Sequence, residues 1–366
     1  MEKDFYSKSI EFASLAKKLS TYEIKRLNHP FLSELPKHLY KYRKSGKAGR
    51  IDFYIGEGKI YTSSLNNFHD KFEGLTPATK QRLLSLNGEG LCRYYRSSII
   101  EILAKRIPSL NIDYAETIFE FIIEKHFDRE AVFECSKSLV KETEQNQLKA
   151  AIGALSYIFE KMDTDLNSNE SFAKGIKMLA NTNDEIGAYC MCDTFSNDSL
   201  WDLYADNFAG YCIEYDLTDP CRSKGSIRFV SSLFPIEYVE RKDDDWFKPL
   251  YETVIKAINV NGKTDLPKGA FLFHHWILKT LCSKKNVWSG EKEWRFLGKG
   301  NSSHRGPIIS SIIVGHNINK CDFLKIHKYA EEKRYSLKIT DIDYSNQSVM
   351  ARDITKLDMD LIMSRE

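Results

Sequence analysis

The chain has 366 residues, with 53 Lys and Arg against 51 Asp and Glu, so its formal net charge is +2. Hydrophobic residues make up 42% and charged residues 28% of the sequence, a composition that excludes a mostly disordered or fibrous chain. The nearly neutral total argues against a protein that is basic over its whole surface, as a general nucleic-acid binder would be. The length predicts two domains, or one domain with a large insertion.

The first residues are charged and lack the apolar core of a signal peptide, and no apolar run approaches the roughly 20 residues of a membrane span. We therefore expect a cytoplasmic protein without a membrane partner. The eight cysteines contain no Cys-x-x-Cys pair, and only Cys190 and Cys192 are close in sequence. Because no second Cys or His pair lies nearby at ligand spacing, we expect reduced thiols in the core and predict no metal site.

Helices dominate the first half of the chain. Apolar residues recur at helical spacing over residues 3–27, and two prolines then interrupt the chain. Alternating apolar residues around a Glu-Gly turn predict two short strands within 51–63. From about 78 to 180 the pattern is helical. Helices are predicted there at 92–106, 112–126, 129–160 and 171–180.

From residue 186 onward, strands alternate with helices. Strands are predicted at 186–195, 210–217, 226–230, 234–240, 293–298, 308–314 and 334–345, and helices at 199–208, 246–258, 268–283 and 319–332. The sequence therefore predicts an α+β fold, with a mixed or antiparallel β core flanked by helices and a large all-helical insertion. The expected parts are an N-terminal helix and linker at 1–36, a core domain formed by 37–77 and 186–366, and a helical insertion or cap at 78–185.

A basic window at residues 37–50 contains six Lys or Arg side chains and no acid. It includes the sequence Tyr40-Lys41-Tyr42-Arg43. Arginine offers a planar fork for phosphate oxygens and tyrosine offers a face for stacking, so this pattern suits a ligand that carries phosphate. A solvated basic loop is the alternative explanation.

Polar residues follow the second strand of the 51–63 segment. Ser63 lies at the strand end, and Asp70 and Glu73 come after it at a spacing of i, i+3. This spacing places both carboxylates on one helix face or in one loop cavity. The alternative is a strand end followed by capping residues.

A strand, a polar turn and a helix follow one another over residues 193–216. Thr194 and Ser196 lie at the strand end, and Trp201 and Tyr204 share one face of the helix. Such a unit places hydroxyl and N–H groups within reach of a ligand. The alternative is that both aromatic side chains belong to the core.

The segment 284–299 carries Glu291 and Glu293 on either side of Lys292, directly before an apolar strand. Alternation along a strand places both carboxylates and Arg295 on one side. Two acids and an arginine that converge in this way favour perturbed pKa values and a functional site. The polar edge of a half-buried strand is the alternative.

These four segments, in this order, resemble the bacterial domain-of-unknown-function family 2971. Its members show a Lys-Tyr-Arg, a Phe-Asn-Asp-Pro-Phe-Glu, a Trp-x-x-Tyr-Ala before a Gly-led strand, and a Trp-x-x-Glu-x-Glu-Trp/Tyr-Arg. The matching residues are Lys41, Tyr42 and Arg43; Phe68, Asp70, Phe72 and Glu73; Trp201, Tyr204, Ala205, Asp206 and Gly210; and Lys284, Trp288, Glu291, Glu293, Trp294 and Arg295. His69 and Lys71 replace the usual Asn and Pro. The resemblance covers residues 37–76 and 186–330.

The order of the motifs is also similar to that of mono-ADP-ribosyltransferases, which show an early Arg, a Ser/Thr-rich strand end and a Glu-x-Glu before a late strand. This resemblance implies an ADP-ribosyltransferase-like enzyme that uses NAD and acts on an unknown macromolecular acceptor, a protein or a nucleic acid, in bacterial defence. It implies that Glu293 stabilises the positive charge on the ribose, that Glu291 orients or deprotonates the acceptor, and that Arg43 holds the pyrophosphate.

The same resemblance implies a set of residues that contact the nucleotide. They are Tyr40, Lys41, Tyr42, Ser63, Asp70, Glu73, Ser196, Trp201, Tyr204, Lys284 and Arg295. It also requires that the expected catalytic residues share one pocket with these aromatic side chains, because one ligand must reach all of them.

Two other functions fit the same motifs. A non-catalytic nucleic-acid or nucleotide-binding module would use the basic window and the cations around residues 279–305. A metal-dependent nuclease would use the carboxylates as a cluster, formed by Asp70, Glu73, Glu291 and Glu293.

Overall fold

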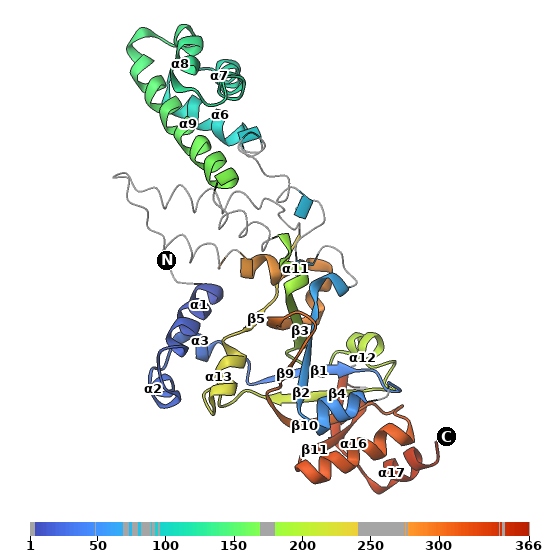
Figure 1. The fold of residues 1–366 in the computed structure, drawn as a ribbon. Coiled ribbons are helices and arrows are strands. Elements are labelled where there is room, and N and C mark those ends of the chain that lie inside the picture. Colours follow the sequence, from blue (N-terminus) through green and yellow to red (C-terminus); the bar gives the residue numbers. More distant parts are fainter. Residues whose placement is uncertain are drawn as a thin grey trace. The chain divides into compact units, whose positions relative to one another are not determined.

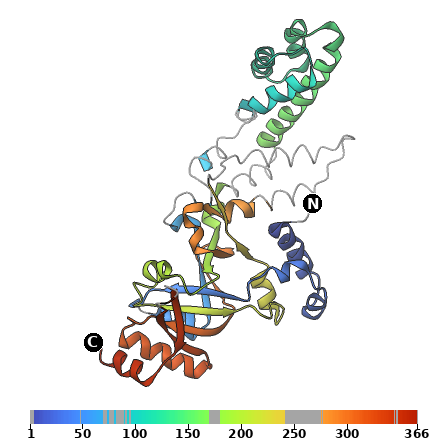
Figure 2. The same ribbon diagram turned by 180° about the vertical axis from the view of Figure 1, so that it is seen from behind.

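The chain divides into two units, one formed by residues 1–76 and 183–366 and the other by residues 77–182. Figures 1 and 2 show the fold from opposite sides. The computed structural model describes residues 4–47, 49–68, 73–74, 80–81, 89, 92–93, 96–168, 180–240, 275, 277–343, 345 and 348–365.

A mixed sheet forms the centre of the first unit. Among the described residues it has ten strands, in the order β12-β11-β10-β4-β1-β3-β2-β9, with β8 paired to β3 and β5 paired to β8. The strands are β1 (His38–Arg43), β2 (Lys59–Ser64), β3 (Ile186–Cys192), β4 (Tyr211–Asp216), β5 (Leu233–Pro235), β8 (Glu293–Lys299), β9 (Ser302–Arg305), β10 (Ile308–Val314), β11 (Ser336–Asp343) and β12 (Ser348–Asp353). A separate parallel pair joins β6 (Glu237–Val239) and β7 (Ser283–Lys285). The predicted α+β class is confirmed.

The sheet divides where β1 meets β3. β1 pairs with β4 along six positions, from His38↔Asp216 to Arg43↔Tyr211, whereas it pairs with β3 at Tyr40↔Cys192. β3 pairs with β8 over its whole length. The strands of the sheet therefore form two parts that meet at a single residue pair, and Figure 1 shows β3 running at a steep angle to β1 and β4.

Helices and further turns surround the sheet. They are α1 (Phe5–Ala16), α2 (Thr21–Arg26), α3 (Pro30–Ser33), α11 (Thr182–Glu185), α12 (Asp198–Tyr204), α13 (Lys224–Val230), α16 (Lys320–Lys333) and α17 (Lys356–Met363). The single helix predicted at 3–27 is two helices, because Ser20 and Glu23 form a capping box that starts α2. α16 lies in the chain between the parallel strands β10 and β11, the order expected of a crossover connection.

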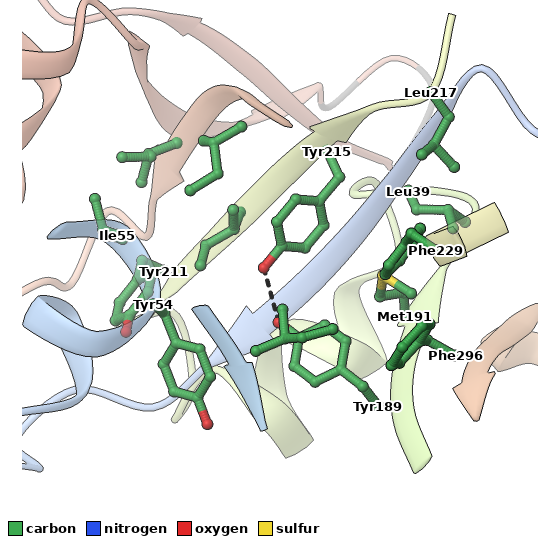
Figure 3. Close-up of a cluster of buried hydrophobic side chains, with 14 of the residues drawn as sticks. Leu39, Tyr54, Ile55, Tyr189, Met191, Tyr211, Tyr215, Leu217, Phe229 and Phe296 are labelled. Carbon is green, nitrogen blue, oxygen red and sulfur yellow. Dashed lines mark hydrogen bonds between the residues drawn. The ribbon is translucent and has the colours of Figure 1, made fainter. Parts of the chain in front are cut away.

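Aromatic side chains fill the core on one face of the sheet. Phe12 and Phe31, from α1 and α3, stack with ring centroids 4.9 Å apart. Tyr189 of β3 and Tyr215 of β4 face each other across β1, and their hydroxyl oxygens lie 2.8 Å apart (Figure 3). Both side chains are buried, so neither hydroxyl could bond to water if the other were removed.

Helices joined by short turns make up the described part of the second unit. Its helices are α6 (Arg96–Arg106), α7 (Ile112–Glu124), α8 (Arg129–Ser136) and α9 (Gln145–Ser168). Asn111 and Asp128 cap α7 and α8. The helix predicted at 129–160 is divided by two 3₁₀ turns, Lys137–Leu139 and Glu142–Glu144. The helices predicted at 171–180 and 246–258, and the first part of 268–283, lie almost entirely outside the described residues.

The strand predicted at the start of 51–63 is wrong. Residues Asp52–Gly56 form one π-helical turn, and only β2 is extended. Tyr54 and Ile55 are adjacent and both buried, which a strand cannot achieve when one face is solvated, because neighbouring side chains point to opposite faces. Asp52 anchors the turn by accepting hydrogen bonds from Lys325 and Tyr329 of α16, at 2.5 and 2.8 Å.

The strand predicted at 226–230 is also wrong, because this segment is helix α13. Ser223 caps it by accepting a hydrogen bond from the amide of Ser226 at 3.1 Å. Ile227 and Val230 are three residues apart and both buried, so these apolar side chains lie on the buried face of a helix. The sequence patterns also missed β1, β7, β9, β12 and α17.

None of the described helices is long and apolar enough to cross a membrane. All eight cysteines are free thiols, and four of them are buried.

The Tyr189–Tyr215 hydrogen bond predicts a non-additive effect on stability. Tyr189→Phe leaves a buried hydroxyl on Tyr215 without its partner, so it should lower the free energy of unfolding by about 1–3 kcal/mol. The double variant Tyr189→Phe/Tyr215→Phe should cost less than the sum of the two single variants. Urea unfolding of all four proteins measures this coupling, and strictly additive costs would contradict it.

Candidate functional site

A buried arginine lies at the centre of the candidate site. Arg295 of β8 is 0% exposed, and its Nε donates to Glu293 Oε1 at 2.6 Å. Nη2 donates to Glu73, and Nη1 donates to the backbone oxygen of Leu281 at 2.8 Å. Because a buried charge is costly unless it is paired and hydrogen-bonded, these partners are what allow a guanidinium at this position.

A lysine supplies the second cation. Lys284 Nζ donates to Glu291 Oε2 at 2.6 Å and to Glu293 Oε2 at 3.0 Å. It also lies 3.5 Å from Glu73 Oε1. We call Glu73, Lys284, Glu291, Glu293 and Arg295 the Glu-Lys-Arg cluster; its three acids and two cations carry a formal charge of −1.

The chain reaches this arrangement by a reversal between β7 and β8. Lys284 lies in β7, and the next residues form the 3₁₀ helix η5 (Asn286–Glu291). Lys292 then adopts a left-handed conformation, with φ 45° and ψ 51°, and β8 begins at Glu293. Glu291 is therefore the last residue of a helix, although strand alternation predicted that it would extend β8. The carboxylates of Glu291 and Glu293 lie close together because both accept hydrogen bonds from the ammonium of Lys284.

The charges of the cluster determine its protonation. Burial alone would raise the pKa of Glu293, but the charges of Arg295 and Lys284 hold this pKa well below its usual value. Burial opposes the charge on Lys284, but Glu293 and Glu73 raise the pKa of its ammonium above the usual value. Both groups are therefore charged at neutral pH.

One side of the cluster reaches the surface through a tyrosine. Tyr204 of α12 donates to Glu291 Oε1 at 2.9 Å and is itself 43% exposed. Burial and then Glu291 raise the pKa of Tyr204, so the phenol stays protonated and keeps donating. Glu293, by contrast, is only 5% exposed. Glu291 is buried too, at 8% exposed, so Tyr204 is the residue through which a ligand from solvent would approach.

The loop after β3 lies beside this surface. Thr194 and Ser196 have hydroxyl oxygens 2.7 Å apart. The next residue, Asn197, donates to the backbone oxygen of Gly290 at 2.8 Å and so ties the loop to η5. Ser196 itself contacts Thr194, and its expected contact with a nucleotide stays a prediction.

Three predicted aromatic contacts lie in another core. Trp201 is 0% exposed, donates from Nε1 to the backbone oxygen of Phe195 at 2.8 Å, and packs edge-on against Tyr42. Tyr42 donates to the backbone oxygen of Thr194 at 3.2 Å, and Tyr40 donates to Glu214 at 2.9 Å. These positions do not support the expected stacking on a ligand.

Arg43 and Lys41 lie on the other face of β3. The Arg43 guanidinium carbon is 5.3 Å from the ring centroid of Tyr189, and Lys41 Nζ is 5.2 Å from the same centroid. Tyr189 and Cys192 are three residues apart in one strand, so they point to opposite faces, and Cys192 is the residue that pairs with Glu293. The structure therefore does not bring Arg43 to the carboxylates with which it was expected to share a pocket.

The remaining two predicted residues are Ser63 and Asp70. Ser63 lies in β2, where it pairs with Ala188 of β3. Asp70 lies outside the described residues.

The comparisons with known proteins give a family. Residues 200–296 match the model of a family described as a protein of unknown function (DUF2971). The match covers 97 of the 366 residues, so it shows similarity to this family over that segment. No curated protein and no solved structure matches the chain. The matched segment contains Tyr204, Lys284, Glu291, Glu293 and Arg295, so the family model covers every member of the cluster except Glu73.

The sequence patterns did not identify two residues that contact the cluster. Tyr238 accepts a hydrogen bond from the amide of Glu293 at 2.8 Å, and the ring of Phe68 lies 5.4 Å from the Arg295 guanidinium carbon. Tyr238 lies in the short strand β6, far from the motifs in sequence, and no local signal marks it. Phe68 belongs to a motif but was not assigned a contact.

No group of three or more His, Cys, Asp or Glu side chains in the described part of the chain could hold a metal ion. The carboxylates of the cluster are instead bound to Lys284 and Arg295. This arrangement keeps the carboxylates of the cluster ionised and in place, and their oxygens bind protein cations and not a cation from solution.

The buried pairs predict a large loss of stability when the arginine is removed. Arg295→Met leaves Glu73 and Glu293 buried without this partner, so the free energy of unfolding should fall by about 3–5 kcal/mol. The matched control is Lys328→Ala, which removes an exposed pair with Glu332 and should cost at most about 0.5 kcal/mol. Urea unfolding measures both, and equal small losses would show that the cluster does not hold the fold together.

The lowered pKa of Glu293 predicts a pH dependence of stability. A carboxyl whose pKa is lower in the folded state stabilises the protein above its unfolded pKa, about 4.3, and this contribution is lost as the pH falls. Between about pH 6 and pH 3 the wild type should therefore lose more stability than Glu293→Gln does. Unfolding free energies across this range test the prediction, and parallel curves for the two proteins would contradict it.

Proposed function

We propose that this protein is an ADP-ribosyltransferase-like enzyme that takes NAD as a substrate and transfers ADP-ribose to a macromolecular acceptor. The observation that carries the proposal is the convergence of Glu291 and Glu293 on one ammonium, that of Lys284, at 2.6 and 3.0 Å. The half-exposed Tyr204 borders this pair of acids.

The proposed reaction breaks the bond between nicotinamide and the ribose C1′ atom. Nicotinamide leaves with the electron pair of that bond, and the ribose develops positive charge as in glycoside cleavage. Glu293, fixed and ionised, would stabilise this charge, since an oriented negative group aimed at the transition state lowers the barrier. The acceptor then forms the new bond to C1′, and Glu291, nearer the surface, would take its proton.

The hydrogen bonds of Glu293 leave room for a substrate hydroxyl. Each of its oxygens already accepts from one cation, Arg295 or Lys284. The thiol of Cys190 also forms a hydrogen bond with Glu293, so about one of the roughly four acceptor positions of the carboxylate remains for a ribose hydroxyl. Tyr204 offers an exposed ring on the same side for a planar group such as nicotinamide. Arg43 has no part in this arrangement, because it lies on the other face of β3.

The metal-dependent nuclease gains no support from the described residues. Glu73, Glu291 and Glu293 are all engaged by protein cations, and none of the described acidic groups forms a metal site. The general nucleic-acid module also loses part of its basis, since Lys41 and Arg43 turn toward tyrosine rings and not outward with the rest of the basic window.

The transferase proposal predicts a steep loss of NAD turnover in one variant. Glu293→Gln removes the negative charge without changing the shape of the side chain, so single-turnover NAD consumption should fall about 10²–10³-fold. Glu291→Gln should slow transfer to the acceptor while leaving more of the NAD cleavage intact. The matched control is Glu214→Gln, a glutamate of β4 in the same sheet that binds Tyr40 outside the cluster. It should keep wild-type turnover.

Nicotinamide release followed by chromatography measures this turnover, and thermal unfolding checks that each variant is folded. Equal turnover in wild type and Glu293→Gln would refute the proposal, as would a folded wild type that consumes no NAD. If Glu293→Gln does not fold, Glu291→Gln provides the decision, because Glu291 pairs with one cation instead of two. Its readout is the transfer of ADP-ribose to the acceptor, and unchanged transfer would refute the proposal.

A further inference from the structure

A second group of charged side chains lies on the Tyr189 face of the sheet. Lys41 and Arg43 are two residues apart in β1, so both side chains point to that face. The Arg43 guanidinium carbon lies 3.7 Å from the ring centroid of Tyr54, and Tyr211 is its neighbour across the ladder with β4. We call Lys41, Arg43, Tyr54, Tyr189 and Tyr211 the Arg43 cluster, and Figure 3 shows its three tyrosines.

The Arg43 cluster contains two cations and no acid. Among the described residues, neither Lys41 nor Arg43 forms an ion pair with a carboxylate. Arg43 interacts with the three tyrosines of the cluster. The charges of Arg43, Cys190, Cys192 and, more weakly, Glu293 act on the pKa of Lys41. Two like charges this deep in a protein repel each other and are poorly solvated, so the arrangement favours a bound negative group.

Two buried polar atoms in the cluster have no hydrogen-bond partner. They are Arg43 Nε and the hydroxyl oxygen of Tyr211, and the Tyr211 side chain is 0% exposed. Buried donors are nearly always satisfied in native proteins, so each unpaired one needs an explanation. An oxyanion with several acceptor atoms would satisfy both of these donors at once. Lys41 and Arg43 remain partly accessible, so such an ion could reach them.

We propose that the Arg43 cluster binds a phosphate group. The guanidinium would bind two phosphate oxygens with its planar fork, the ammonium of Lys41 would supply the second positive charge, and the hydroxyl of Tyr211 would donate a further hydrogen bond. The phosphate could be free or belong to a nucleotide. This inference does not rest on the transferase proposal, because the cluster and Glu293 lie on opposite faces of β3.

The protonation of Lys41 supports this proposal. Burial, and then the charge of Arg43, lower the pKa of Lys41 below its usual value. A bound phosphate would offset both effects and raise this pKa again. Binding at alkaline pH should therefore be accompanied by proton uptake at Lys41, a signature that non-specific attraction to surface lysines would not produce.

Calorimetric titration of the full chain tests the proposal with three probes: inorganic phosphate, pyrophosphate and ADP. The wild type should bind at least one of them saturably. Lys41→Met should weaken that binding about tenfold or more, and Tyr211→Phe about two- to tenfold, the loss expected for one hydrogen bond. The matched control is Lys44→Met, one residue beyond β1 and exposed, which should leave binding unchanged. Repeating the titration in two buffers of different ionisation enthalpy measures the proton uptake.

The outcomes are distinct. ADP that binds much more tightly than phosphate identifies a nucleotide ligand, and equal affinities identify a free phosphate site. No saturable binding of any probe up to about 10 mM, or equal weakening by Lys41→Met and Lys44→Met, would overturn the proposal. Glu293→Gln should keep or tighten phosphate binding, since it removes a negative charge near Lys41, even where it abolishes NAD turnover. The two proposals can therefore fail independently. Thermal unfolding confirms that each variant is folded.

Discussion

The pairing of Arg295 with two glutamates is the interaction on which this part of the protein depends. A fully buried guanidinium cannot lose its proton, so the surrounding chain must supply negative charge and acceptors. Glu293 comes from the same strand, whereas Glu73 comes from a segment more than two hundred positions earlier. Two buried carboxylates need more than one cation, and Lys284 of β7 supplies the second positive charge. One buried charge thus links β7, η5 and β8 to the region that follows β2.

The strand β3 separates two groups of opposite electrostatic character. Its Cys190 and Cys192 side lies beside Arg295 and Glu293, while its Tyr189 side lies beside Arg43. The first group is formally negative and the second is positive. The chain's net charge of +2 averages over both, which is why composition alone revealed neither. β1 pairs with β3 at Tyr40, next to Lys41, so charges on both sides of β3 act on the pKa of Lys41.

The sequence allowed the long periodic elements to be predicted, and not the elements whose form depends on distant contacts. β8, β10 and α16 follow from alternation and helical spacing. The turn at Asp52–Gly56 does not, because the residues that hold it, Lys325 and Tyr329, lie in α16. Short polar strands such as β9 and β12 carry too few apolar residues for a periodic signal, and only their pairing partners make them strands.

The candidate site shows the same limit. The convergence of Glu291, Glu293 and Arg295 could be predicted from spacing, but the reason was partly wrong, because the left-handed Lys292 and not a continuous strand brings Glu291 into place. The separation of Arg43 from these acids could not be predicted. This separation depends on the register in which β1 and β8 pair with β3. A shift of one residue in either register would move the side chains to the opposite face of the sheet.

Stability alone does not account for the Glu-Lys-Arg cluster. Buried ion pairs can often be replaced by apolar side chains of similar volume without loss of stability, since desolvation offsets most of the attraction between the charges. The adjoining core, with Leu281, Cys282 and Phe234 buried, already provides apolar surroundings for such a replacement. Five charged residues at this point therefore favour a role that needs fixed charge. Tyr204 connects that charge to the surface, which a purely internal structural cluster would not require.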